Sequence, residues 1–337
     1  MPTLLDFLRK INIRASIALD EPMARHTSLR IGGPADALVA PESVAELEIL
    51  VGAAHDEGIA LTILGGGANL LVGDRGIRGI VVDLRRLRGI AFEDAGADEE
   101  QTRDGTERLR SGAGAGRLEA GVGLLRARAG AGASLSRLCE KAMALGRGGL
   151  ENFYAMPGSV GGSVYMNARC YEVEMSERIE SLLFLDGMGH SRRIEIEPSS
   201  WSYKRSPFQA GQAEAGALIL EASFLLPPAD PEAVRATMIA RLRDREEKGH
   251  FRLPSAGSMF KNDRSLGRPT GVILDSLGFR GRRIGDAMVS PWHANIFVNA
   301  GKASASEMLA LVELARSETL RSLGLAIEPE VLFVGEN

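Results

Sequence analysis

The sequence predicts a protein of mixed helix and strand, with two α/β units up to about residue 226 and a smaller α+β unit after it. Short apolar strands alternate with capped helices between residues 30 and 90, and two more strands are expected at about 179–186 and 218–225. The composition then changes at Pro227-Pro228. The predicted domains are therefore 1–88, 89–226 and 227–337.

The first unit contains the clearest local signals. Ser43 with Glu46 fits a capping box, so a helix is predicted to start there and to end near Gly58. Two apolar runs, 61–64 and 79–84, are predicted to be strands. The first of these strands leads directly into a run of glycines.

The second unit is expected to be less regular. The segment at about 91–121 is rich in Gly, Ala, Glu and Arg, and is expected to be a surface hairpin or a mobile insertion without chemistry. A helix is predicted at 134–145, from Ser134 to the breaker Gly146. The glycine-dense segment 149–171 is predicted to be too irregular for a helix.

The third unit carries two helix signals and a final strand. Asp230 is expected to cap a helix that Gly249 closes. A second helix is predicted from the capping box of Ser304 with Glu307, and strand 330–335 ends the chain.

Composition limits the possible classes of protein. The 337 residues have a net charge of −4, which provides no strong basic field for nucleic acid. No apolar run approaches a membrane span or a signal peptide. Cys139 and Cys170, the only cysteines, cannot form a disulfide framework. We therefore expect a cytoplasmic protein with no nucleic-acid or membrane partner and, by default, a monomer.

The first glycine motif is Gly65-Gly66-Gly67, preceded along the chain by the related run 31–35. Bare backbone after a strand can direct several N–H groups at one point, which suits a pyrophosphate, and Asn69 could add a donor. The alternative is a tight turn that needs positive φ. Neither G-x-G-x-x-G between strand and helix nor G-x-x-x-x-G-K-[ST] occurs, so a Rossmann site and a P-loop are not expected.

Two other segments could contact a ligand. PGSVGGS (157–163) could line a flat ring or a phosphate, or could simply allow two chain segments to pack closely. In WSYKRS (201–206), Lys204 and Arg205 could hold a carboxylate or phosphate. Composition alone favours a solvated basic turn for the second segment.

Three polar residues near the end of the chain are weaker candidates. The hydroxyl of Ser258 could donate a proton with Lys261 nearby, although a lone Ser is usually a turn residue. Glu330 lies at the start of the last predicted strand, next to Pro329, and an acidic residue in such a position commonly just faces solvent. His293 has no second ligand at metal spacing, so no metal site is predicted. Alone, these motifs indicate an α/β protein that binds a phosphorylated ligand.

Together and in this order, the motifs resemble the UDP-N-acetylenolpyruvoylglucosamine reductase family. The spacing from Tyr203 to Ser258 is similar to the shorter of the family's two forms, which lacks an extra substrate-covering loop. The matching segments are HTSLRIGGPADALVAP (26–41), LGGGANLLV (64–72), MPGSVGGSVYMNA (156–168), PSAGSMFKN (254–262), VSPWHANIFVN (289–299) and IEPEVLFVG (327–335).

The resemblance implies a fold, a cofactor and site residues. The fold would be the FAD-binding fold of the vanillyl-alcohol oxidase type, with non-covalent FAD between the first two domains and the UDP-sugar on the third. The cofactor-binding residues implied are Gly65, Gly66, Gly67, Ala68, Asn69, Leu70, Pro157, Gly158, Ser159, Gly161, Gly162 and Asn167. The substrate-binding residues implied are Tyr203, Lys261, Asn262, His293 and Asn295.

The resemblance also implies a reaction. NADPH reduces FAD, and the flavin then gives hydride to the enolpyruvyl group of UDP-N-acetylglucosamine enolpyruvate, yielding UDP-N-acetylmuramate for peptidoglycan. A cation and Glu330 stabilise the charge that develops, and Ser258 protonates the carbon. The family has Arg after the Tyr, where this chain has Lys204 and then Arg205, so either could be the cation.

A second departure lies at 169–172, where Arg-Cys-Tyr-Glu replaces the family's usual Gly-Ala-Tyr-Gly. Two alternatives to the reductase remain open. One is a related oxidase with flavin linked covalently to a histidine, for which His26 and His55 are the early candidates. The other is a non-catalytic protein that binds flavin or a UDP-sugar.

Overall fold

The computed structural model describes residues 4–95 and 123–337. The chain forms two compact units, one made of Met1–Arg86 with Leu242–Asn337 and the other of Leu87–Arg241. The first unit therefore combines the beginning of the chain with its end. The division into three domains at 88 and 226 stays a prediction.

The N-terminal part of the first unit is a four-stranded sheet in the order β1-β2-β5-β3. β1 is antiparallel to β2, whereas β2, β5 and β3 are parallel. The elements here are α1 (Leu4–Lys10), β1 (Ser16–Pro22), β2 (Pro34–Ala40), α2 (Val44–Asp56), β3 (Leu61–Leu64), β4 (Leu70–Val72) and β5 (Ile77–Asp83).

Helix α2 begins as predicted but its capping box is only half formed. The Ser43 hydroxyl accepts the N–H of Glu46 at 3.2 Å. The Glu46 carboxylate accepts from the backbone of Glu42 at 2.8 Å, one residue earlier than a capping box requires.

The C-terminal part of the same unit is a four-stranded antiparallel sheet in the order β13-β16-β15-β14. Its core is shared with the start of the chain, because Leu29, Ile31 and Leu71 pack with Phe260 and Phe297. The elements are β13 (Ser255–Ser258), α6 (Thr270–Ser276), β14 (Arg283–Ile284), β15 (Ala287–Val289), β16 (Ile296–Asn299), α7 (Ala305–Leu323) and β17 (Leu332–Val334).

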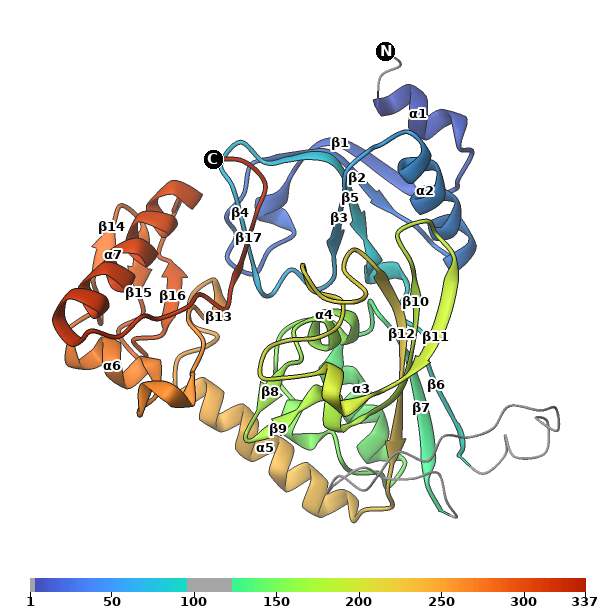
Figure 1. Ribbon diagram of the computed structural model, residues 1–337. Helices are drawn as coiled ribbons and strands as arrows, with labels where there is room; N and C mark the ends of the chain where they lie inside the picture. Colours follow the sequence, from blue (N-terminus) through green and yellow to red (C-terminus); the bar gives the residue numbers. More distant parts are fainter. Residues whose placement is uncertain (1–3, 96–122) are drawn as a thin grey trace. The chain divides into compact units, whose positions relative to one another are not determined.

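The last strand returns to the first part of the chain. β17, red in Figure 1, pairs in parallel with β4, which follows the glycine loop. Helix α7 has the full capping box predicted for Ser304 and Glu307.

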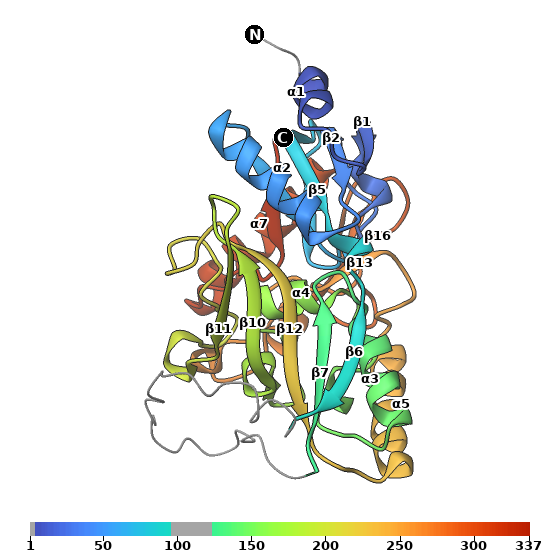
Figure 2. The same cartoon turned by 90° about the vertical axis from the view of Figure 1, so that its right-hand side faces the viewer.

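The second unit is built on a five-stranded antiparallel sheet in the order β11-β10-β12-β7-β6, whose strands lie side by side in Figure 2. Its elements are β6 (Ile90–Asp94), β7 (Leu125–Gly130), α3 (Leu135–Ala144), α4 (Val160–Tyr165), β8 (Arg169–Cys170), β9 (Val173–Glu174), β10 (Ile179–Leu185), β11 (Ser191–Glu195) and β12 (Leu218–Leu226). Helix α5 (Pro231–Glu247) contains the boundary between the two units.

Two sequence predictions for this unit were wrong in part. Residues 91–94 belong to β6, which pairs along its length with antiparallel β7, so this part of the segment agrees with the hairpin alternative and not with a mobile insertion. The rest of the predicted insertion, 96–122, lies outside the described residues. The segment 149–171 contains helix α4, which Ser159 caps by accepting the N–H of Gly162 at 3.3 Å.

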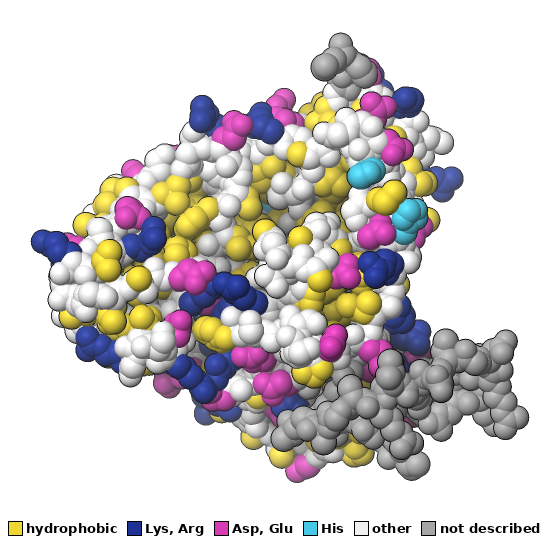
Figure 3. Space-filling model, viewed as in Figure 1, with side chains coloured by type: hydrophobic (Ala, Val, Ile, Leu, Met, Phe, Trp, Pro, Cys, Tyr) yellow, Lys and Arg dark blue, Asp and Glu magenta, His cyan; other side chains and the backbone are white. Residues whose placement is uncertain are grey.

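The surface carries charge of both signs. On the face shown in Figure 3, Lys and Arg side chains are interspersed with Asp and Glu. Among residues 4–95 and 123–337, no helix has the length and apolar character needed to cross a bilayer.

Candidate functional site

The glycine loop between β3 and β4 is shaped by one close approach. Gly67 has a φ of 63°, and a Cβ on it would lie 2.0 Å from the carbonyl oxygen of His26. The Gly67 carbonyl in turn accepts the N–H of Ser28 at 3.0 Å. Within the described residues, no protein group accepts the backbone N–H of Gly66, Gly67 or Ala68. The loop therefore offers bare backbone donors and fits the pyrophosphate of FAD.

Asn69 ties this loop to the last strand. Its side-chain nitrogen donates to the carbonyl of Glu330 at 3.1 Å, and its own carbonyl accepts the N–H of Leu332 at 3.0 Å. Leu70, also predicted to contact the cofactor, begins β4. The loop and the predicted acid are therefore neighbours in one unit.

Ser258 is brought to the same place by backbone hydrogen bonds. It ends β13, and the carbonyl of the next residue, Met259, accepts the N–H of Glu330 at 2.8 Å. Both Ser258 and Glu330 are half-buried. Two of the predicted catalytic residues thus lie on adjacent segments beside the glycine loop.

Three predicted substrate-binding residues in this unit already contact other residues of the protein. Asn295 is fully buried, its amide nitrogen donates to the carbonyl of Phe260 at 2.8 Å, and its oxygen accepts the Phe260 N–H at 3.0 Å. Asn262 accepts the N–H of Thr270 at 2.9 Å. Lys261 pairs with Glu328 at 2.6 Å. These contacts favour a positioning role for Asn295, and its contact with substrate stays a prediction.

His293 is held in one tautomer. Its Nδ1 accepts the N–H of Asn295 at 3.1 Å, so the proton is on Nε2. Burial lowers the pKa of His293, and the charges of Lys248 and Arg280 add to this. Burial also lowers the pKa of neighbouring His250 to about 4. Both rings are therefore neutral near pH 7.

In the second unit, the motif 157–163 has more than one role. Gly158 has a φ of 125° just before the Ser159 cap, and follows Pro157. Gly161 donates its N–H to the carbonyl of Ala131 at 2.9 Å, and a Cβ on it would lie 2.7 Å from the Ala131 Cβ. Close packing of two segments, the alternative considered for this motif, therefore accounts for Gly161. Gly162 donates to the Ser159 cap.

The Tyr203 motif forms a tight turn. Ser202 and Arg205 exchange backbone hydrogen bonds of 3.2 and 2.9 Å, and Lys204 has a φ of 58°. The Lys204 Nζ lies 6.0 Å from the centre of the Tyr203 ring, whereas Arg205 is exposed. The geometry favours Lys204 over Arg205 as the cation beside Tyr203.

Asn167 holds this turn in place. It is fully buried, its amide donates to the carbonyl of Ser202 and to Glu174, both at 2.9 Å, and its oxygen accepts the N–H of Ser176. Gln209 adds a hydrogen bond of 3.1 Å to the Lys204 carbonyl. No motif in the sequence indicated Gln209, because its role depends on a turn that only the fold creates.

The histidines considered for covalent flavin attachment are differently placed. His26 has both ring nitrogens engaged, with Glu21 at 2.9 Å and with Arg85 at 2.6 Å. His55 is exposed on α2. The two hydrogen bonds of the His26 ring favour a structural role.

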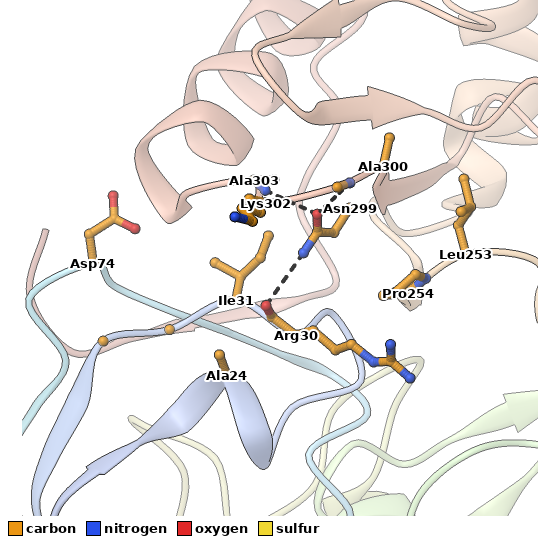
Figure 4. Close-up of a pocket in the computed structure, with 13 residues that line it drawn as sticks. Ala24, Arg30, Ile31, Asp74, Leu253, Pro254, Asn299, Ala300, Lys302 and Ala303 are labelled. Atoms are coloured by element: carbon orange, nitrogen blue, oxygen red, sulfur yellow. Dashed lines mark hydrogen bonds between the residues drawn. The ribbon is translucent and has the colours of Figure 1, made fainter.

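A cavity of about 560 Å³ opens in the first unit between the loop at 30–33 and the segment 299–303. Asn299 joins the two, since its amide donates to the carbonyl of Arg30 at 3.4 Å and its oxygen accepts the N–H of Ala303 at 3.0 Å (Figure 4). The run 31–35, paired with the glycine motif in the sequence, contributes Ile31, Gly32 and Gly33 to its lining, whereas the predicted catalytic, cofactor-binding and substrate-binding residues do not line it.

Two protein-family models match the chain. The model described as FAD binding domain matches residues 35–195, and the model for UDP-N-acetylenolpyruvoylglucosamine reductase, C-terminal domain, matches residues 249–334. The reductase of that name from Treponema denticola is 35% identical over 329 residues, covering 95% of this chain and 94% of the relative. The chain belongs to the UDP-N-acetylenolpyruvoylglucosamine reductase family.

Two further comparisons support this family. The reductase from Desulfosudis oleivorans is 38% identical over 325 residues, covering 96% of each chain. The crystal structure of the reductase from Thermus caldophilus matches with a TM-score of 0.70 and 27% identity, over 96% of this chain and all of that one. The predicted family and FAD-binding α+β fold are therefore confirmed.

Proposed function

We propose that the chain reduces UDP-N-acetylglucosamine enolpyruvate to UDP-N-acetylmuramate with NADPH, through non-covalently bound FAD, in peptidoglycan precursor synthesis. Membership of the reductase family supports the reaction. The observation that carries it is local: Ser258 and Glu330 lie on hydrogen-bonded segments next to a glycine loop whose backbone donors at 66–68 have no acceptor among residues 4–95 and 123–337.

The residues of the chain have distinct tasks in this proposal. The N–H groups of 66–68 hold the pyrophosphate of FAD, and bound FAD supplies the hydride chemistry. Glu330 and Lys204 stabilise the negative charge that develops on the substrate. Ser258 then donates its proton to the substrate carbon, which is a strong enough base to accept it from an alcohol.

The proposal extends to the setting of the enzyme. We propose a cytoplasmic monomer whose partners are the UDP-sugar and NADPH. The engaged ring of His26 supports non-covalent flavin. Denaturing the protein tests that point, because non-covalent FAD passes into the supernatant while covalent flavin stays with the chain.

The deciding experiment measures NADPH oxidation by the FAD-loaded protein, with and without UDP-N-acetylglucosamine enolpyruvate. We expect oxidation that depends on the substrate and yields UDP-N-acetylmuramate. A yellow protein that oxidises no NADPH in either condition would contradict the proposal and would favour a non-catalytic binding role.

Lys204 provides a test of one residue within this reaction. We expect Lys204→Ala to slow reoxidation of the reduced flavin by substrate about 10²-fold, because charge stabilisation is lost, and to leave reduction by NADPH nearly unchanged. Stopped-flow absorbance separates the two half-reactions. Arg205→Ala is the matched control and should change neither, while equal losses in both half-reactions of Lys204→Ala would exclude the assigned role.

A further inference from the structure

Two cationic side chains from separate segments of the second unit lie against one phenol ring. The Arg169 guanidinium carbon is 5.5 Å from the centre of the Tyr203 ring, and the Lys204 Nζ is 6.0 Å from the same centre. Both distances are typical of cation–π contacts. Tyr203 and Lys204 belong to the predicted site, whereas Arg169 was not among the predicted site residues.

Arg169 is well placed to bind an anion. Its side chain is only 18% exposed, and electrostatic interactions are stronger where water is partly excluded. It forms an ion pair with Glu172, whose side chain is 75% exposed. An exposed carboxylate is a weak, solvent-screened partner, and a guanidinium with five N–H donors can bind a second carboxylate.

The hairpin that carries Arg169 is held in an unfavourable conformation. Tyr171 and Glu172 form its turn with φ angles of 48° and 68°, in positions where Asn and Gly are favoured. Tyr171 stacks on Arg241, whose guanidinium lies 3.9 Å from the ring centre. Lys204, on the facing turn, is also in the left-handed region. Backbone strain of this kind concentrates at functional sites.

We propose that Arg169 binds the carboxylate of the substrate's enolpyruvyl group, together with Lys204 and beside Tyr203. The inference rests on the proposed function. Lys204 presents a point charge, whereas the planar guanidinium of Arg169 can form the paired hydrogen bonds that a carboxylate accepts. The hydrogen bond to Glu172 holds the guanidinium beside the Tyr203 ring. Lys204 then neutralises the charge of the carboxylate, and Arg169 fixes its orientation.

Isothermal titration of the oxidised, FAD-loaded enzyme tests this without turnover. The two ligands are UDP-N-acetylglucosamine enolpyruvate and UDP-N-acetylglucosamine, which differ by the carboxylate-bearing group. We expect Arg169→Gln to raise the Kd for the enolpyruvyl ligand about 10- to 100-fold, as for the loss of a charge-assisted hydrogen bond, and to leave the Kd for UDP-N-acetylglucosamine within about twofold. Arg169→Lys should give a smaller loss.

The chain provides a matched control in Arg192. This arginine lies 5.4 Å from the centre of the Phe184 ring and pairs with Glu214 at 3.3 Å, so it repeats the contacts of Arg169 at a more exposed position of the sheet. Arg192→Gln should change neither affinity, and FAD content reports folding of every variant. Equal weakening of both ligands by Arg169→Gln, or no weakening, overturns the assignment. If the wild-type enzyme binds no enolpyruvyl ligand, the proposed function itself fails, which is a separate result.

Discussion

Gly67 is the residue of the glycine loop that leaves no space for a side chain. Its left-handed φ of 63° disfavours any other residue, and a Cβ would collide with the His26 carbonyl, which is backbone and cannot rotate away. The contact fixes the direction of the neighbouring N–H groups. The His26 carbonyl oxygen therefore sets the backbone conformation of the loop, and in the proposed function these N–H groups bind the pyrophosphate of FAD.

Replacing Gly67 by Ala should weaken FAD binding by at least about tenfold and lower the free energy of unfolding by more than about 1 kcal/mol, since the loop must shift. Flavin fluorescence titration and urea unfolding measure the two effects. Gly58→Ala is the control, because Gly58 has a φ of 65° but no atom within 4 Å of a built Cβ. It should cost about 1 kcal/mol and leave FAD binding unchanged; identical behaviour of the two variants would contradict the proposed role of the close approach.

At the scale of elements, the turn at 202–205 depends on a side chain from elsewhere in the sequence. Asn167, at the end of α4, donates to the Ser202 carbonyl and thereby positions Tyr203 and Lys204. Its φ of 40° suits an asparagine better than most residues. A residue predicted to lie near the flavin thus has its amide committed to holding a loop.

We expect Asn167→Ala to lower the free energy of unfolding by about 2–4 kcal/mol, because the fully buried amide takes with it its two bonds to Ser202 and Glu174 and its bond from Ser176. FAD affinity should change by no more than about threefold if the residue acts through the turn alone. Thermal unfolding and flavin titration measure these effects. Asn152→Ala, which removes one bond of 3.0 Å to Arg241, is the control and should cost about 1 kcal/mol. A large loss of FAD affinity would instead indicate direct contact with the cofactor.

At the scale of the whole molecule, stability should depend on pH through His250. Burial, with Arg245, His293 and Lys248 nearby, lowers its pKa from 6.5 to about 4. Below pH 6.5 the unfolded chain therefore binds a proton that the folded chain does not bind until about pH 4. The stability associated with His250 is present above pH 6.5 and is lost as the pH falls toward 4.

Between pH 7.5 and pH 5.0 this residue should reduce the free energy of unfolding by about 2 kcal/mol. Urea unfolding at the two pH values measures the change, and His250→Gln removes the titrating group. The variant should lose correspondingly less stability over the same interval. If wild type and variant lose the same amount, another group carries the pH dependence.

The sequence predicted α2, α3, α5 and α7 because their capping and end signals are local, but it missed α4. Ser304 with Glu307 and Ser134 with Gly146 identified α7 and α3. Strands of two to four residues, as in the sheet of β13 to β16, contain too few positions to show alternation.

The site was predicted less completely than the fold. The role of Arg169 depends on the turn at 202–205 reaching the hairpin at 169–174, and the bond from Asn69 to Glu330 joins residues far apart in the chain. Neither leaves a local signal in the sequence. The composition of the first unit from two distant segments is hidden for the same reason.

The first unit is made of two segments separated in the chain by the second unit, and this affects the order in which the units can fold during synthesis. β4 leaves the ribosome long before its partner β17, because the paired residues Leu70 and Leu332 are far apart in the chain. At typical elongation rates the delay is on the order of tens of seconds. During that interval Leu71 and the other apolar residues of the first segment lack the core they later share, while the second unit already has its complete sheet. The second unit should therefore fold before the first is complete, and a chaperone would be expected to bind the first segment of the first unit until β17 has been made.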